Sequence, residues 1–231
     1  MLRAGADVIK VHATGGVTSP TDHPDFTQFS IEELKVMVEE AQFRGNRKVM
    51  AHAQGLQGVK NCIAAGIHSI EHGIYLDDEA IEKMKAQGTF LVPTLLAPVS
   101  VIEFADELGM SEGSVEKSKE VLEAHTTSFT KAVNAGVKIA MGTDAGVFKH
   151  GTNLRELELM VEHGMTPMQA IVASTKTAAE CLGYDNEIGT IETDKKADFI
   201  IVDDNPLDRI GILKNPDNIK IVGIDGEIVK R

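Results

Sequence analysis

The chain has 231 residues, of which 42% are hydrophobic and 25% are charged, and its formal net charge is −12 at pH 7. This length predicts one large domain or a domain with a small appendage, and the composition is ordinary for a globular protein. The acidic excess argues against nucleic acid and against anionic membrane surfaces as binding partners.

Cysteine usage and hydropathy predict a cytoplasmic protein. Cys62 and Cys181 fall in expected helices and form no CxxC pair, which suits reduced, buried thiols and excludes a zinc site built from cysteines. No run approaches the roughly 18 apolar residues that span a bilayer, and the start, MLRAGADVIK, lacks the apolar core of a signal peptide. Because residues 2–5 read as the last turn of a helix, we expect that the sequence begins inside a larger protein.

A repeated pattern of helix, glycine and short apolar run indicates the fold class. Its copies are RAGADVIKVH, FRGNRKVMAH, AAGIHSIEH, KAQGTFLVPT and NAGVKIAMGTD. Glycine just past a helix adopts the left-handed conformation without steric cost, so each glycine predicts a helix end. The apolar runs are near-continuous, as in parallel strands that are covered on both faces. Strands that alternate with helices in this way predict an α/β fold.

The segments between these strands carry helix signals. Ser30, with Glu33 at the capping-box spacing, begins the first helix, and Gly66 closes a helix over Leu56–Ala65. Acidic residues from Asp77 onward favour the start of the next helix. Further helices are expected within 97–135, with breaks near Gly109 and Gly113, at 153–163, and at 167–182 with Thr166 as the cap.

Residues 183–231 are expected to form a small β-rich region, beside a main domain at 1–182. The tail holds short β-rich runs, and Asp225-Gly226 between apolar segments is a hairpin signal. It is too short for a stable core of its own, so we expect a small sheet that packs on the larger domain.

Polar residues stand at or near the end of each predicted strand: Lys10, His52, His72, Thr94 and Asp144. The carboxyl ends of parallel strands meet at one edge of a sheet, which is where α/β proteins place their chemistry. His52 or His72 alone is better explained as a core histidine. Together, in register on neighbouring strands, they favour a site for a zinc-like ion.

Alternatives remain for the other members of this set. Lys10 is equally consistent with a lysine that extends out of an edge strand into water. Asp144 is as consistent with a turn cap as with a carboxylate that binds metal and takes a proton from water.

The remaining histidines carry weaker signals. His12 has the side-chain parity of Lys10 and is undecided, and His68 is expected to be structural. His150 lies in the loop after Asp144 and can reach the site. His23, His125 and His163 are expected to face solvent. No GxxxxGK[ST], GxGxxG, GxSxG or HExxH motif occurs, so phosphate loops, nucleotide folds and serine-hydrolase elbows have no support.

At these residues the chain resembles the amidohydrolase superfamily, and within it the imidazolonepropionase-like proteins and the Xaa-Pro and Xaa-Arg/Lys dipeptidases. The resemblance covers essentially the whole length. Its motifs are GADVIKVHATGGVTSP, AHAQG, SIEHG, FLVPTL, GTDAGVFKHGTNLREL, IGTIETDKKADFIIVDDNPL and IKIVGIDGEIVK.

The resemblance implies a (β/α)8 TIM-type barrel, here strands 4–8 only, with a metal centre at the strand ends and part of a small β-sandwich domain. It implies that Lys10 is the fourth-strand lysine, often carbamylated, and that His52 and His72 are metal ligands. Asp144 would bind metal and act as general base, and His150 and Asn153 would contact substrate. The implied cofactor is a divalent metal, zinc, as one or two ions.

The departure from the family is the missing first part of the barrel. The family's first strand carries a His-x-His pair that completes the second metal site, and no His-x-His occurs in this sequence. Five strands cannot close an eight-stranded barrel. We therefore expect a homo-oligomer or a missing N-terminal segment that completes the barrel.

The expected function is hydrolysis of an amide or peptide C–N bond by metal-activated water, on a small dipeptide-like substrate. One alternative is a truncated, non-catalytic remnant that folds or binds metal only with a partner segment. Another is a cyclic-amide hydrolase or deaminase of the same superfamily.

Overall fold

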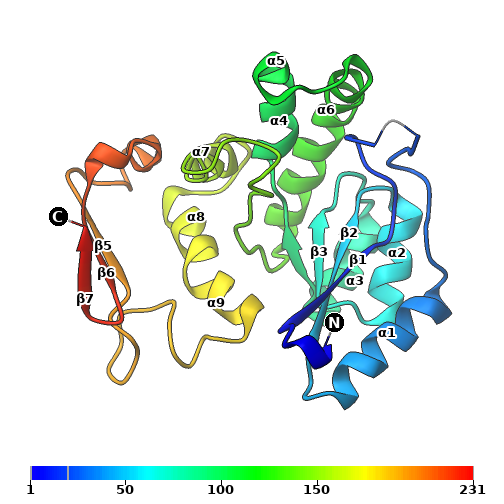
Figure 1. Cartoon of the computed structure of the whole chain (residues 1–231), viewed down its shortest axis with the longest axis horizontal. Helices are drawn as coiled ribbons and strands as arrows, with labels where there is room; N and C mark the ends of the chain where they lie inside the picture. Colours follow the sequence, from blue (N-terminus) through cyan, green and yellow to red (C-terminus); the bar gives the residue numbers. More distant parts are fainter. Residues whose placement is uncertain (1, 20, 231) are drawn as a thin grey trace.

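The computed structural model describes residues 2–19 and 21–230. Met1, Arg231 and Pro20, the last residue of the first family motif, lie outside the described residues. The centre of the chain is a parallel four-stranded sheet in the order β1-β2-β3-β4 (Figure 1). Its strands are β1 (Val8–His12), β2 (Lys48–Ala53), β3 (Ser69–His72) and β4 (Phe90–Val92).

The strand register brings the histidines to one edge of the sheet. His12 pairs with His52 across β1 and β2, and Ala53 pairs with His72 across β2 and β3. All these pairings are parallel, so the carboxyl end of each strand lies on the same side. The repeat in the sequence therefore predicted both the alternation of elements and the edge at which the polar residues gather.

Helices α1 (Ile31–Phe43), α2 (Leu56–Ala65) and α3 (Asp78–Gln87) connect these strands and lie together on one side of the sheet (Figure 1). That side is the core, because alternate strand residues that face the helices are buried, among them Val49, Ile70 and Leu91. On β1 the opposite face carries exposed residues, including Val8 and Lys10.

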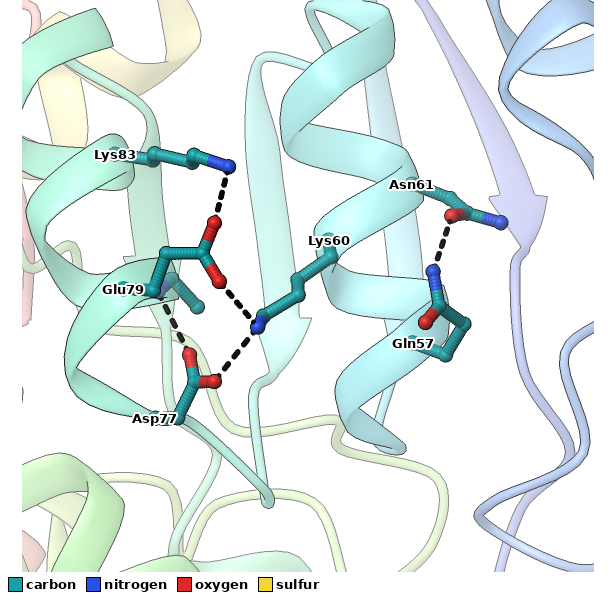
Figure 2. Close-up of polar contacts among 7 residues, drawn as sticks. Gln57, Lys60, Asn61, Asp77, Glu79 and Lys83 are labelled. Carbon is teal, nitrogen blue, oxygen red and sulfur yellow. Dashed lines mark hydrogen bonds and ion pairs between the residues drawn. The ribbon is translucent and has the colours of Figure 1, made fainter.

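The expected caps are present. Ser30 and Glu33 form a reciprocal capping box at the start of α1, and the left-handed Gly66 ends α2. Asp77 accepts a hydrogen bond from the backbone N–H of Ala80 at 2.8 Å. The same carboxylate helps to join α2 to α3, because Lys60 Nζ lies 2.7 Å from Asp77 and 2.6 Å from Glu79 (Figure 2).

The fifth predicted strand is reduced to a single bridge, and this part of the prediction was wrong. Ile139 pairs in parallel with Leu91 as an isolated bridge. Immediately afterwards, the N–H of Met141 donates to the carbonyl oxygen of Ala173 at 2.9 Å, so the backbone leaves the ladder for the C-terminal helices. No strand among the described residues pairs with the other side of this segment.

Two helix predictions also need correction. The excursion after β4 forms α4 (Leu96–Glu103), α5 (Ala105–Leu108) and α6 (Glu112–Ala135), in which Gly109 ends α5 but Gly113 lies inside α6. After α7 (Arg155–Glu162), the single helix expected at 167–182 is divided into α8 (Pro167–Ser174) and α9 (Lys176–Leu182). The break is at Thr175, whose φ of −122° and ψ of −87° are not helical.

The C-terminal region forms an antiparallel sheet in the order β5-β6-β7, at the far end of the molecule from β1. Its strands are β5 (Phe199–Val202), β6 (Ile219–Ile224) and β7 (Glu227–Lys230). Asp225 and Gly226 both have positive φ at the turn between β6 and β7, as the hairpin signal predicted. Short 3-10 helices complete the chain: η1 (Leu2–Ala4), η2 (Ile210–Lys214) and η3 (Pro216–Asn218).

The contact of this region with the rest of the chain differs from the expectation. The element that packs on the larger part is η2, which lies against α7 and buries Ile210, Ile212 and Leu213. The strands instead leave Ile200, Ile201 and Val229 substantially exposed.

A cavity of about 440 Å³ lies near the amino ends of the parallel strands, on the inner face of the sheet, which is the face opposite α1, α2 and α3. Glu71 of β3 lines it and accepts a hydrogen bond from the Ser69 hydroxyl at 2.7 Å. Burial raises the pKa of Glu71 to about 7.

None of the helices in residues 2–19 and 21–230 has the length and apolar character needed to cross a membrane.

Candidate active site

The carboxyl edge of the parallel sheet borders a cavity of about 270 Å³. Four of the residues predicted for the site line it together: Lys10, His52, His72 and Asp144. They come from three neighbouring strands and from the loop after the Ile139 bridge, so residues 134 positions apart in sequence meet at one place. The opposite wall is apolar and is formed mainly by α4 and α6, with Ala97, Val101 and Val121 among its residues.

Lys10 and His12 project from β1 into the open side of this cavity. Both side chains are exposed, because β1 is the edge strand of the sheet. The His12 ring stacks on the His52 ring with 4.8 Å between their centroids. His12, which the sequence left undecided, is therefore part of the site.

His52 is held at the floor of the cavity by the loop after β1. Only 8% of the residue is exposed, and its Nε2 lies 3.0 Å from the carbonyl oxygen of Gly15. Since a carbonyl oxygen only accepts, this contact places a proton on Nε2 and leaves the lone pair on Nδ1. Gly15 is required there, because a Cβ at that position would collide with the carbonyl oxygen of His23. Burial is the main cause that lowers the pKa of His52.

His72 lies next to His52, with 4.6 Å between ring centroids and an interplanar angle of 71°. Its Nδ1 is 2.6 Å from the hydroxyl oxygen of Thr94. Burial, followed by the neighbouring His52 and His125, holds the pKa of His72 well below its usual range. Both imidazoles are therefore neutral near pH 7, which is the form that can bind a metal ion.

Left-handed backbones occur at three residues of this edge: His72 at the end of β3, Thr94 after β4, and Asp144 after the Ile139 bridge. The φ angles are 73° at His72, 53° at Thr94 and 58° at Asp144. Residues other than glycine seldom adopt this conformation, and for a β-branched threonine it is strongly disfavoured. Such strain gathers at functional sites, where the surrounding structure maintains it. Asp144 is exposed at the mouth of the cavity.

His150 and Asn153 are the predicted site residues that the structure does not place in the cavity lining. His150 is exposed on the loop that follows Asp144. Asn153 donates from Nδ2 to the Thr143 hydroxyl at 3.0 Å, and its Oδ1 accepts from the N–H of Gly151. Asn153 thus holds this loop against the residue that precedes Asp144.

His125 was expected to face solvent, and that prediction was wrong. It is 1% exposed and lines the cavity from α6. Its Nε2 lies 2.8 Å from the carbonyl oxygen of Pro93 and 3.1 Å from that of His72. Burial lowers the pKa of His125 to about 4. A histidine inside a long helix carries no sequence signal of these distant carbonyl partners.

Two further buried residues were missed by the sequence analysis. Gln54, next to the cavity, is 4% exposed, and its Oε1 has no hydrogen-bond partner among the described residues. Glu156 on α7 is completely buried and accepts from the N–H groups of Leu95 and Leu96, immediately after Thr94. The only signals were the position of Gln54 two residues after His52 and a glutamate among leucines in the segment LRELELM.

The donors around the cavity fit a divalent metal in type and fall short in number. Neutral imidazoles and a carboxylate are the ligands that zinc-like ions prefer. In the part of the chain that the structure describes, however, no group of three His, Cys, Asp or Glu side chains is arranged to hold a metal ion. His52 and His72 form the closest pair, and a complete coordination shell needs further ligands.

Comparison with known proteins places these features in context. A model of the amidohydrolase family matches residues 1–229. The ochratoxinase of Aspergillus niger is 40% identical over 234 residues, which cover 99% of this chain and 47% of the ochratoxinase. Its crystal structure matches with a TM-score of 0.86 at 41% identity, over 99% of this chain and 52% of that one.

Two further relatives extend the comparison. The imidazolonepropionase of Thermoanaerobacter pseudethanolicus is 30% identical over 191 residues, which cover 79% of this chain and 40% of the relative. The crystal structure of a Xaa-Pro dipeptidase with bound methionine in its active site matches with a TM-score of 0.90 at 39% identity, over 100% of this chain and 56% of that one. The chain thus spans about half the length of the curated relatives it matches.

Proposed function

This chain belongs to the amidohydrolase family, and we propose that it supplies the C-terminal half of the active site of a metal-dependent hydrolase of amide or peptide C–N bonds. The observation that carries the proposal is the meeting of Lys10, His52, His72 and Asp144 around one cavity. A dipeptide-like substrate is favoured because similar structures include a Xaa-Pro dipeptidase, and because the wall opposite the histidines is apolar.

We assign the metal-holding role to His52, His72 and Asp144, with Lys10 as a fourth ligand once it is carbamylated. The two imidazoles are buried and have lowered pKa values, so their lone pairs are available at neutral pH. Zinc suits this donor set. A divalent cation held by these residues would lower the pKa of water and would polarise the scissile carbonyl group.

Asp144 is the proposed general base. Its carboxylate stands at the exposed mouth of the cavity, where water and substrate both have access. An Asp144 carboxylate oxygen accepts a proton from the attacking water and then passes it to the leaving nitrogen. His150 and Asn153 are proposed substrate contacts, since the hydrogen bond of Asn153 to Thr143 holds their loop beside Asp144.

The active enzyme is proposed to need polypeptide beyond this chain. β1 has an open outer edge in the described part of the sheet, and the described residues contain no group of three His, Cys, Asp or Glu side chains arranged to hold a metal ion. An N-terminal segment or a second copy would cover that edge, and residues 183–231 would form one part of a composite β-rich domain. The competing hypothesis is a non-catalytic remnant that binds metal only with such a partner segment.

The test compares this chain with the protein expressed from the longest open reading frame that contains it. Both are loaded with Zn²⁺, and amine release is measured from Xaa-Pro and Xaa-Arg dipeptides, an N-acyl phenylalanine and a cyclic amide. We expect dipeptide hydrolysis that disappears in His72→Asn and persists in His163→Asn, a half-buried histidine away from the cavity. A folded, zinc-loaded protein that hydrolyses none of these compounds would favour the remnant. Selective turnover of the cyclic amide would favour an imidazolonepropionase-like reaction.

A further inference from the structure

The contact between His72 and Thr94 determines which ring nitrogen of His72 carries the proton. Nδ1 of His72 lies 2.6 Å from Thr94 Oγ1, and that hydroxyl donates to the carbonyl oxygen of Pro93 at 2.7 Å. A hydroxyl group has one proton. The carbonyl oxygen of Pro93 can only accept, so we assign the Thr94 proton to that contact and infer that Oγ1 accepts from Nδ1–H of His72. The lone pair of His72 is therefore on Nε2.

The position of Thr94 depends on support from outside its own loop. Its φ of 53° is unfavourable for a β-branched residue, so the segment around Thr94 would not keep this conformation by itself. The next two backbone N–H groups, of Leu95 and Leu96, donate to Oε1 and Oε2 of Glu156 at 2.7 and 2.8 Å. Both oxygens of the completely buried Glu156 side chain thus accept from the two residues that follow Thr94.

The carbonyl group of Pro93 is fixed from the other side. Nε2–H of His125 donates to it at 2.8 Å, while the proton of the Thr94 hydroxyl reaches the same oxygen. His125 comes from α6 and Glu156 from α7, so two helices distant in sequence hold the short segment that carries Thr94.

We propose that Glu156 is a positioning residue, which acts through the Leu95 and Leu96 amides and through Thr94 to keep the His72 proton on Nδ1 and the lone pair on Nε2. The proposal deepens the proposed function, on which it rests, because a ligating imidazole must present one lone pair in a fixed direction. The simpler alternative is that Glu156 only caps the N-terminus of α4 and has no influence on His72.

The first test needs no variant. Long-range ¹H–¹⁵N NMR spectra of the metal-free chain at pH 7.5 report which nitrogen of each histidine carries its proton. We expect His72 as the Nδ1–H form, and an Nε2–H form would overturn the proposal directly.

The second test uses matched variants on the same helix. Glu156→Gln replaces one acceptor oxygen with an NH₂ group that faces a backbone N–H, whereas Glu158→Gln changes a glutamate that bonds Lys214 of η2. Glu156→Gln is expected to produce a mixture of His72 tautomers, and Glu158→Gln is expected to keep the wild-type spectrum. A folded Glu156→Gln chain with an unchanged His72 spectrum would show that Glu156 acts only as a helix cap and would overturn the positioning role.

Thr94 gives an independent check if Glu156→Gln does not fold. Thr94→Ser keeps the hydroxyl and should keep the Nδ1–H form, whereas Thr94→Val removes the acceptor and should lose it. An Nδ1–H signal that survives in Thr94→Val would contradict the proposal.

Metal titration separates this inference from the proposed function. In Glu156→Gln, Zn²⁺ affinity measured by competition with a chromophoric chelator should fall by about 10- to 100-fold, the usual effect of losing an outer partner of a ligating histidine. If the His72 tautomers change in Glu156→Gln but no form of the chain binds zinc, the metal site is refuted and the positioning role of Glu156 stands. If the tautomers do not change and zinc binds normally, the positioning role is refuted and the metal site stands.

Discussion

Nζ of Lys48 on β2 lies 2.7 Å from the carbonyl oxygen of Cys181 on α9, although the two residues are 133 positions apart in sequence. The same ammonium group lies 3.1 Å from the carbonyl oxygen of Glu180, and Nε2 of His68 lies 2.8 Å from that of Cys181. A helix leaves its last carbonyl groups without partners in its own turns, and the N–H of Gly183 caps those of Ala179 and Glu180. Lys48 of β2 adds a donor to Glu180 and Cys181, and His68, just before β3, lies against Cys181, so both residues tie α9 to the parallel sheet.

We predict that Lys48→Met destabilises the chain by about 1–2 kcal/mol, because the α9 carbonyl groups lose a charged donor near a helix C-terminus. The free energy of unfolding from urea titration measures the change. The control is Lys60→Met, which breaks the exposed ion pairs between α2 and α3 shown in Figure 2. Exposed pairs of this kind contribute little. A Lys60→Met effect as large as that of Lys48→Met would contradict this interpretation.

Replacement of the proposed base should separate catalysis from binding. We predict that Asp144→Asn lowers kcat by about 10²- to 10⁴-fold in the protein from the longest reading frame, since proton transfer contributes on that order. KM should change far less, because asparagine has nearly the same shape. Steady-state kinetics on a Xaa-Pro dipeptide provide both values. A full-rate Asp144→Asn enzyme would assign the proton transfer to another group.

Glu71 should make the stability of the chain depend on pH. Its pKa is raised by burial from 4.5 in the unfolded chain to about 7 in the folded chain. Its stabilising contribution is therefore complete below pH 4.5 and is lost as the pH rises through 7, because the folded state must then bury a charge. The total effect is at most about 3 kcal/mol.

Glu71→Gln tests this dependence. Urea unfolding at pH 5, 6, 7 and 8 should show that the wild type loses stability relative to Glu71→Gln over this range. Glu79→Gln, in the exposed network of Figure 2, should follow the wild-type profile. Parallel pH profiles for wild type and Glu71→Gln would show that the Glu71 carboxylate is solvated.

The open edge of β1 predicts self-association of the isolated chain. An edge strand presents unpaired backbone groups to other strands, and Val8 on this strand is 42% exposed. Light scattering should give a mass above that of one chain, and Val8→Lys should reduce it. Ile191→Lys, at a residue that is 92% exposed outside both sheets, should have no such effect. A monodisperse monomer with a sharp two-state melt would refute the prediction.

Local signals determined how much of the fold was predictable. Ser30, Gly66 and Thr166 act on their own helix ends, so their roles can be inferred from neighbouring residues alone. Lys10, His52, His72 and Asp144 could be grouped because parallel strands bring their carboxyl ends together. The break at Thr175 was missed because no glycine or proline marks it.

The unpredicted parts of the site depend on tertiary contacts. His125 reaches the carbonyl groups of His72 at the end of β3 and of Pro93 after β4, and Glu156 bonds amides about 60 positions away in sequence. Neither partner is identifiable from the residues around these two side chains. Likewise, the fifth strand ends at the Ile139 bridge because the N–H of Met141 donates to the carbonyl oxygen of Ala173, which is distant in sequence.

The left-handed backbones of His72, Thr94 and Asp144 oppose the stability of the chain to the geometry of the proposed site. Each such residue costs of order 1–3 kcal/mol, which folding elsewhere must offset. A laboratory selection for heat resistance alone should therefore enrich glycine or asparagine at positions 94 and 144, and would raise the melting temperature while it dismantled the site. Stabilised variants that remain useful as catalysts should instead carry their changes far from this cavity, for example on the exposed surfaces of α1 or α3.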